Sequence, residues 1–325
     1  GGTVKRIVIC LSFLCLLLGV GCAKQEETKN STGRIELPYT QTVEKYGIKG
    51  KLILNKKPER VVTLSFTPVM ALYEMGIPQV AVPVNRISRW PEELQKRAKQ
   101  MNTGMASNVD IEAVVSLHPD LVLLPYHSKD KYGKLLEKQN IPVYYVDAGP
   151  AMSYQSVKEL IQVLATAFGS KTEAAGKIME RFTVLEARMT KERESNQGKK
   201  VMILLSAPPH HYIQGENTNL GSMLKMLGYT NVFQEQNVKN SMVLLDKEKA
   251  LSYDPDVVVC VGMGTEAQHR SNMEKDFAGN PKYWQHIRAF CEGKIVYLPA
   301  RYAISSGIGV TEDIHELIDV LKRIK

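Results

Sequence analysis

Side chains that can hold a metal complex follow several of the apolar segments of this sequence. The thioether of Met, the imidazole of His and the phenol of Tyr are donors that bind haem iron, and the guanidinium of Arg pairs with carboxylates through two hydrogen bonds. The candidate ligand-binding residues of these types are Arg86, Arg89, Trp90, Met105, Tyr126, His127, His210, His211, Met263, Arg301 and Tyr302. We expect them to line one pocket.

The expected position of these residues supports a shared pocket. They follow apolar segments that we interpret as parallel strands, and open α/β sheets bind ligands beyond the carboxyl ends of their strands. Each residue type also has a plainer interpretation, which stays open. A Met is often a flexible filler of core gaps, and His and Arg are common on solvated loops.

Alternating apolar and helical segments predict the elements that position this pocket. Apolar runs lie at 80–84, 120–125 and 143–147, and the later chain repeats them at 201–205, 256–262 and 294–299. Segments of helical periodicity separate these runs, which is typical of α/β proteins with mostly parallel sheets covered on both faces. Upstream, we expect two short strands over residues 42–55, around Gly47 and Gly50.

An internal repeat indicates two similar lobes. Val109–Leu124 and Leu245–Cys260 share six of sixteen residues at a constant offset, and each reads as a helix, a Pro-Asp turn and a buried strand. Asp110 and Asp246 stand where helix N-caps belong. Glu112 and Glu248 follow in the first turns, where the helix dipole favours a carboxylate.

A long helical stretch connects the two repeats. Residues 153–168 are amphipathic, and residues 171–195 place apolar side chains at helical spacing with charges on the other face. The second segment would be roughly 37 Å long at 1.5 Å per residue. We therefore predict two α/β lobes joined by one long rigid α-helix, with little closure of one lobe on the other.

The first residues resemble an export signal with a lipid-attachment site. Lys5 and Arg6 precede an apolar run over residues 7–21, and Cys22 follows small residues as in a bacterial lipobox. A plain signal peptide with a fortuitous Cys is the alternative.

The predicted organisation is a signal peptide over 1–21, lipidated Cys22 and a tether over 22–40, an N-terminal lobe over 41–152, helices over 153–198 and a C-terminal lobe over 199–325.

Composition excludes several classes of protein. The chain has 325 residues, of which 44% are hydrophobic and 23% charged, which excludes disordered, collagen-like and multi-span membrane proteins. The net charge of +8 is spread along the chain, so we do not expect nucleic-acid binding. Beyond the tether only Cys260 and Cys291 remain, which excludes a disulfide framework.

The ordered set of features resembles a known family. Residues 47–62, 110–124 and 216–232, together with the lipobox and the long helix, are similar to the helical-backbone, class III substrate-binding proteins of ABC importers for ferric siderophores, haem and cobalamin. The stretch 261–267 looks most similar to haem-binding lipoproteins of that family. The resemblance implies a non-enzymatic receptor that captures an iron complex between two lobes, with haem as first choice and a ferric siderophore or cobalamin as alternatives.

The resemblance also implies roles and partners. Met263 would bind haem iron, with Met105 close to the position of the family's other iron-binding Met, and Glu112 and Glu248 would dock onto a two-fold permease served by a cytoplasmic ATPase. His127 is a further candidate for binding haem iron because it follows a predicted strand. The protein would be a monomer, held by its lipid at the extracytoplasmic face of the bacterial cell membrane. As a binding protein it would need no cofactor of its own.

Enzyme motifs offer a weaker interpretation. Gly262–Ala267 fits the GxGxxA pattern of dinucleotide-binding enzymes, but the following residues lack a good apolar helix face and no acidic residue ends the next strand. No GxSxG or HExxH motif is present. A surface protein for adhesion or peptide binding is a distant alternative.

Overall fold

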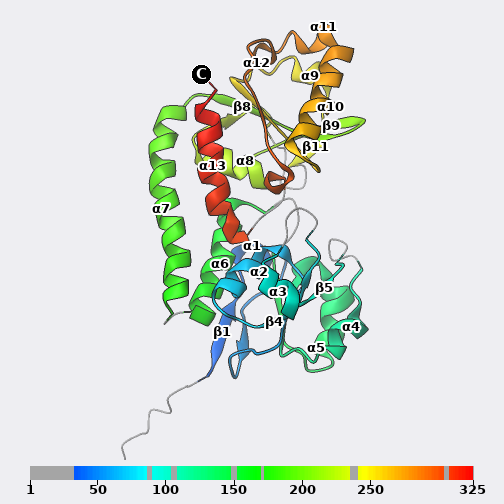
Figure 1. Ribbon diagram of the computed structural model, residues 1–325, viewed down its shortest axis with the longest axis vertical. Helices are drawn as coiled ribbons and strands as arrows, with labels where there is room; N and C mark the ends of the chain where they lie inside the picture. Colours follow the sequence, from blue (N-terminus) through cyan, green and yellow to red (C-terminus); the bar gives the residue numbers. More distant parts are fainter. Residues whose placement is uncertain are drawn as a thin grey trace, which may run out of the picture. The chain divides into compact units, whose positions relative to one another are not determined.

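Two β-sheets, one from each half of the chain, form the framework of the protein (Figure 1). The computed structural model describes residues 33–85, 90–103, 108–147, 152–169, 172–234, 241–303 and 307–324. Within these residues, the expected fold of two similar α/β lobes joined by a long helix is confirmed.

The N-terminal lobe contains a sheet of five parallel strands in the order β5-β4-β3-β6-β7. Its strands are β3 (Val61–Thr63), β4 (Gln79–Pro83), β5 (Lys99–Met101), β6 (Leu121–Pro125) and β7 (Val143–Val146). Its helices are α2 (Phe66–Glu74), α3 (Glu92–Arg97), α4 (Ile111–Ser116) and α5 (Lys134–Glu137). A separate antiparallel pair, β1 (Ile35–Pro38) and β2 (Lys51–Leu54), flanks the short helix α1 (Gln41–Lys45).

The C-terminal lobe contains a mixed sheet in the order β11-β9-β8-β12-β13, with β10 also paired to β8. Its strands are β8 (Lys200–Ala207), β9 (His210–Gln214), β10 (Thr230–Asn231), β11 (Met242–Leu244), β12 (Val257–Gly262) and β13 (Ile295–Tyr297). Its helices are α8 (Asn219–Met226), α9 (Lys247–Ala250), α10 (Glu266–Gly279), α11 (Pro281–Trp284) and α12 (Arg288–Cys291). The β8–β9 and β9–β11 pairs are antiparallel, so this sheet is only partly parallel.

Strand alternation divides the apolar side chains between two sides of each sheet. On β12, Val257, Val259 and Val261 pack into one large core, whereas Val258 and Cys260 pack into a cluster on the opposite face. The strand β6 divides its residues in the same way. Because successive side chains of a strand point to opposite faces, these continuous apolar runs identify strands that are buried on both sides.

The large core is shared by the two lobes and the helices between them. These helices are α6 (Tyr154–Gly169), α7 (Glu173–Asn196) and the final helix α13 (Val310–Lys322). The 24 residues of α7 span about 36 Å. Figure 1 shows α13 beside α7, so two long helices, not one, run along this side of the protein.

Ion pairs fasten these helices together. Arg181 of α7 lies 3.0 Å from a carboxylate oxygen of Glu74 on α2 and 2.8 Å from one of Glu312 on α13. Further along α7, Arg188 donates to Asp319 of α13. With both helices held at several points, the structure favours a rigid connection between the lobes.

The segment after β1 differs from the sequence prediction. Residues 41–45 form helix α1 where we expected a strand, because Thr40 caps the helix by accepting a hydrogen bond from Val43 N at 3.4 Å. The Thr40 hydroxyl also donates to Asp147 at the end of β7, at 2.8 Å. Asp147 is 1% exposed, and burial raises its pKa to about 6.

Gly307 marks a close approach between the C-terminal segment and the N-terminal lobe. Its φ is +61°, and a Cβ atom there would lie 2.2 Å from the carbonyl oxygen of Thr67 at the start of α2. Glycine adopts this backbone conformation without strain and has no Cβ atom that would collide with Thr67. Among the described residues, no helix is both long and apolar enough to cross a membrane.

The Gly307 contact predicts a large loss of stability on substitution. We expect Gly307→Ala to lower the free energy of unfolding by about 3 kcal/mol, from the left-handed backbone and the collision with Thr67 together. The control Gly76→Ala has a similar φ of +69° with no heavy atom within 4 Å of the added Cβ. It should lose only about 1 kcal/mol. Urea denaturation measures both, and equal losses would contradict the close contact.

The buried carboxyl group predicts a pH-dependent stability. The folded protein binds the Asp147 proton more tightly than the unfolded chain, so ionisation costs stability as the pH rises from the ordinary carboxyl pKa of 3.8 through about 6. Asp147→Asn should therefore raise the free energy of unfolding by about 2–3 kcal/mol near pH ~8 and change it little near pH ~3.5. Urea denaturation at both pH values checks this, and a pH-independent change would refute it.

Candidate functional site

A hollow lies at the edge of the C-terminal sheet where β8 and β12 end, which we call the carboxyl-edge hollow. Its volume is about 640 Å³, within the usual range of ligand pockets. Three elements line it: the end of β8, the turn after β12, and one face of α10. The lining residues are Ser206, Ala207, Pro208, Met263, Gly264, Ala267, Gln268, His269, Ser271, Asn272 and Lys275.

Met263 is displayed on the turn that follows β12. Its side chain is 68% exposed, which is more than any other large hydrophobic side chain in the described part of the chain. The preceding Gly262 is needed for the packing of the turn, because a Cβ there would lie 2.5 Å from Nδ1 of His269 and 2.7 Å from the Ser206 carbonyl. The turn therefore presents a thioether to the hollow from a closely packed base.

His269 lies under this turn and was missed by the sequence analysis. It is 2% exposed, and its Nε2 has no hydrogen-bond partner among the described residues. Burial lowers the pKa of the imidazole, while Glu266 and a hydrogen bond to the Gly264 backbone act in the opposite direction. We interpret His269 as a neutral residue that positions the Met263 turn. The residues that follow Gly262 in the sequence form no motif that would have identified His269 as part of the site.

The start of α10 fixes the other side of the turn. Thr265 accepts a hydrogen bond from Gln268 N at 3.2 Å, and the Gln268 side chain accepts one from Thr265 N at 2.7 Å. This reciprocal arrangement is a capping box, which satisfies donors at the helix start. The Thr-x-x-Gln spacing is a sequence signal for the helix that the periodicity analysis overlooked.

At the edge of the N-terminal sheet, Tyr126 and His127 follow β6 as expected. Tyr126 stacks on Tyr46, with ring centroids 4.2 Å apart, and its edge contact with His127 spans 5.6 Å. His127 is exposed, and Tyr126 is partly buried. Burial and the Tyr46 hydroxyl raise the pKa of Tyr126, so that its phenol stays neutral at physiological pH.

Four of the expected ligand-binding residues have structural contacts instead. Trp90 is buried and donates to the Pro83 carbonyl at 2.7 Å, and Tyr302 is buried and donates to the Asp313 carbonyl at 2.8 Å. Arg301 is engaged by Asp313 at 2.9 Å and by Glu316. His211 is buried against Trp284, with Nε2 3.3 Å from Asp276, and burial lowers its pKa. These four side chains are therefore not part of the candidate site.

The remaining candidates divide into two groups. His210 is exposed on β9, at the β8–β9 hairpin. Arg86, Arg89 and Met105, as well as Cys22, lie outside the described residues.

The repeated acids have the predicted local geometry in both lobes. Asp110 caps α4 by accepting from Ala113 N at 2.9 Å, and Asp246 caps α9 by accepting from Glu248 N at 3.0 Å. Glu112 and Glu248 are exposed in the first turns of these helices. The sequence repeat therefore corresponds to a repeated structure with one exposed glutamate on each lobe.

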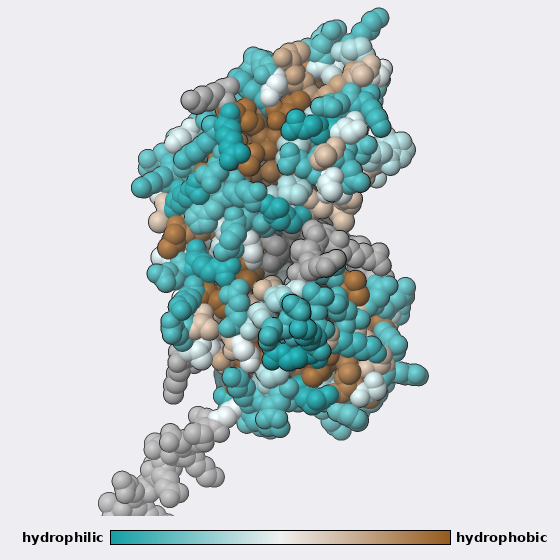
Figure 2. Space-filling model, in the orientation of Figure 1, coloured by the Kyte–Doolittle hydropathy of each residue, from teal (hydrophilic) through white to brown (hydrophobic). Residues whose placement is uncertain are grey.

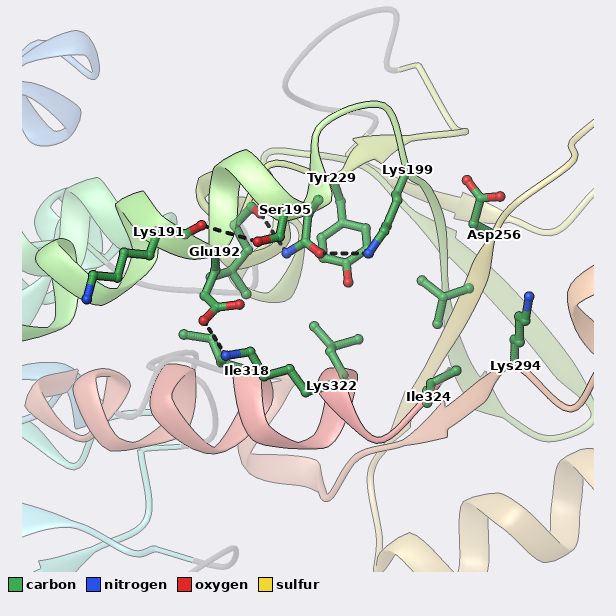
Figure 3. Close-up of a pocket in the computed structure, with 14 residues that line it drawn as sticks. Lys191, Glu192, Ser195, Lys199, Tyr229, Asp256, Lys294, Ile318, Lys322 and Ile324 are labelled. Atoms are coloured by element: carbon green, nitrogen blue, oxygen red, sulfur yellow. Dashed lines mark hydrogen bonds and ion pairs between the residues drawn. The ribbon is translucent and has the colours of Figure 1, made fainter.

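A second hollow of about 550 Å³ lies where α7 and α13 end, at the opposite edge of the C-terminal sheet (Figure 3). Figure 3 shows an ion pair between Glu192 and Lys322 across it, and Lys199 donates to Asn196. Asp256 at its rim is paired with Arg288. Because its carboxylates are already paired and it lies away from the carboxyl ends of the strands, we interpret this hollow as a structural feature rather than a ligand site.

The face drawn in Figure 2 is largely hydrophilic and carries apolar patches in its upper and lower halves. Within the described ranges, no group of three or more His, Cys, Asp and Glu side chains could hold a bare metal ion.

The chain matches a family of known proteins. Residues 61–302 match the family described as periplasmic binding protein. A cobalamin-binding protein of Halobacterium salinarum is 30% identical over 215 residues, which cover 64% of this chain and 55% of that protein. The chain thus spans just over half the length of that relative.

Two further relatives match over most of their length. An ABC transporter substrate-binding lipoprotein of Bacillus subtilis, YvrC, is 21% identical over 94% of this chain and 93% of its own. The structure of Staphylococcus aureus IsdE complexed with heme is similar with a TM-score of 0.65 and 19% identity, over 81% of this chain and 98% of that one. This last similarity supports the two-lobed fold.

Proposed function

The chain belongs to the periplasmic binding protein family, and from this membership we propose that it captures an iron complex outside the cytoplasm and delivers it to an ABC permease. The expected resemblance to class III substrate-binding proteins is confirmed, as is the prediction that the protein is not an enzyme. The strand-turn-helix at Gly262–Ala267 is thus part of a binding protein rather than of a dinucleotide-binding enzyme.

We propose haem as the first choice of ligand. The observation that carries this choice is Met263, an exposed thioether held over a hollow by a closely packed turn. A thioether is a soft ligand that suits haem iron better than ferric iron surrounded by oxygen donors. IsdE, a relative of known structure, was solved with heme. On the N-terminal lobe, Met105 and His127 stay the candidates for a second iron ligand.

The mechanism we propose is capture by a site that exists before the ligand arrives. The shared core and the α7–α13 ion pairs hold the two lobes, so binding requires little ordering of the protein. A ferric siderophore and cobalamin are the alternatives within the same fold, and a cobalamin-binding protein is among the relatives. The protein would act as a monomer tethered through lipidated Cys22, in line with the lipoprotein relative.

A haemin titration tests the ligand. We expect purified protein to shift the Soret band of haemin saturably at one equivalent, and Met263→Ala to alter that spectrum and weaken binding by roughly tenfold, about 1.4 kcal/mol. His286→Ala is the matched control, because His286 is an exposed side chain of the same lobe, outside the hollow. It should bind haemin like the unaltered protein.

Each other outcome has a definite meaning. If haemin leaves the spectrum unchanged, haem is wrong, and fluorescence quenching by ferric siderophores and cobalamin is the next measurement. If haemin binds but Met263→Ala changes nothing, haem stands and Met263 is not its ligand.

The exposed repeated acids suggest how the permease is recognised. Glu112 and Glu248 occupy equivalent positions in similar lobes, which suits docking to a permease with two-fold symmetry. We expect Glu112→Lys with Glu248→Lys to abolish ligand uptake by cells while leaving ligand affinity unchanged, because the charge is reversed only on the docking surface.

A second pair of glutamates provides the control for this experiment. Glu92 of α3 and Glu173 of α7 are also exposed in first turns of helices. Glu92→Lys with Glu173→Lys should therefore keep normal uptake. Uptake that survives reversal of Glu112 and Glu248 would rule out their docking role.

A further inference from the structure

Three aromatic rings form a shelf beyond the end of β6. Tyr46, at the end of α1, lies parallel to Tyr126 with an interplanar angle of 17° and a centroid distance of 4.2 Å. His127 meets Tyr126 at 84°. Residues far apart in the sequence thus build one surface, which we call the aromatic shelf: Tyr46, Tyr126 and His127.

The shelf offers a free ring face. One face of Tyr46 is covered by Tyr126, yet 55% of Tyr46 is exposed, so its other face is open to solvent. It is the only aromatic side chain among the exposed large hydrophobic residues described. A stacked Tyr pair holds the outer ring in a defined orientation, which lowers the cost of binding another flat group.

The position of the shelf connects it with ligand binding. Tyr126 and His127 directly follow β6, a central strand of the N-terminal sheet, and parallel α/β sheets bind ligands beyond the carboxyl ends of their strands. The Thr40–Asp147 hydrogen bond holds α1, and therefore Tyr46, to the end of the neighbouring strand β7. If the Tyr46–Tyr126 pair served only to pack the core, the ring of Tyr46 would not need to be exposed.

The charges beside the shelf favour an acidic ligand. Lys45 and Lys49 flank Tyr46 in the sequence and are exposed. In the described part of the chain, neither ammonium group forms an ion pair with a carboxylate. Asp147 also acts electrostatically on Tyr126, but it is 1% exposed, whereas the two lysines lie at the surface. A neutral ring face flanked in the sequence by two exposed cations suits a flat conjugated group that carries carboxylates.

We propose that the aromatic shelf binds the flat face of a planar, conjugated, acidic ligand, and that Tyr46 is a specificity-determining residue for that class. The inference deepens the proposed function and rests on it. It separates planar ligands such as porphyrins from non-planar iron complexes such as ferric citrate. The shelf contributes through ring stacking, whereas iron coordination is assigned to other residues, so the two contributions can be measured separately.

Metal-free protoporphyrin IX is the probe that isolates stacking, because it has the flat ring and the carboxylates but no iron. We expect Tyr46→Leu to weaken its binding about 3- to 10-fold in a fluorescence titration, in proportion to the usual strength of one aromatic contact. Tyr46→Phe keeps the ring and should bind like the unaltered protein. Leu251→Ala, an exposed apolar residue of the C-terminal lobe, is the matched control and should also leave affinity unchanged.

The lysines provide an independent measurement. Lys45→Gln with Lys49→Gln should weaken protoporphyrin binding and reduce its dependence on salt, since exposed charge interactions are screened. Thermal unfolding of every variant establishes that the fold is retained. If Tyr46→Leu lowers the melting temperature, the protoporphyrin affinities of Tyr46→Leu and Tyr46→Phe are compared at a temperature where both variants are folded. A weaker affinity of Tyr46→Leu at that temperature supports the shelf, and equal affinities contradict it.

The outcomes separate this inference from the proposed function. If haemin and protoporphyrin bind but Tyr46→Leu and Tyr46→Phe equal the unaltered protein, the shelf is refuted and haem capture stands. If haemin fails to bind, haem capture is refuted, and the protoporphyrin titrations of Tyr46→Leu and Tyr46→Phe still test the shelf. Binding of ferric citrate but of neither porphyrin would overturn the shelf as well.

Discussion

The shared apolar core between the two sheets is the constraint on which the rest of the structure depends. One face of β6 and one face of β12 contribute to the same cluster, which is completed by α6, α7 and α13. Exposing this interface would cost roughly 25 cal/mol for each Å² of apolar surface. The lobes are therefore held by the hydrophobic effect first, while the Arg181 and Arg188 ion pairs add orientation more than stability.

Both candidate ligand-binding features lie at the ends of strands. The strand β6 is apolar along its length, and the hollow with Met263 and the aromatic shelf both lie where strands end. Their chemistry differs: the C-terminal lobe displays a thioether on a closely packed turn, and the N-terminal lobe displays stacked neutral rings. We propose that a metal complex with a flat organic frame uses both.

Much of this arrangement could be predicted from particular residues. The apolar runs at 120–125 and 256–262 became β6 and β12, the segment 171–195 became α7, and the repeated Asp-x-Glu pattern became two capped helices. Such features depend on local spacing, which a single sequence displays. The segment 41–45 was mispredicted because its helix depends on the Thr40 cap, and the antiparallel β9 was hidden because strand direction is set by partners.

The sequence by itself determined the fold class, the duplication and the residue types available for a metal complex, because periodicity and composition are local properties. Only the tertiary structure decided which of those residues are free. Trp90, Tyr302 and Arg301 look like ligand contacts in a list of loop residues, but packing and ion pairs engage them. His269 and Tyr46 acquire their places through contacts with Gly262 and Tyr126, and no sequence spacing encodes such neighbours.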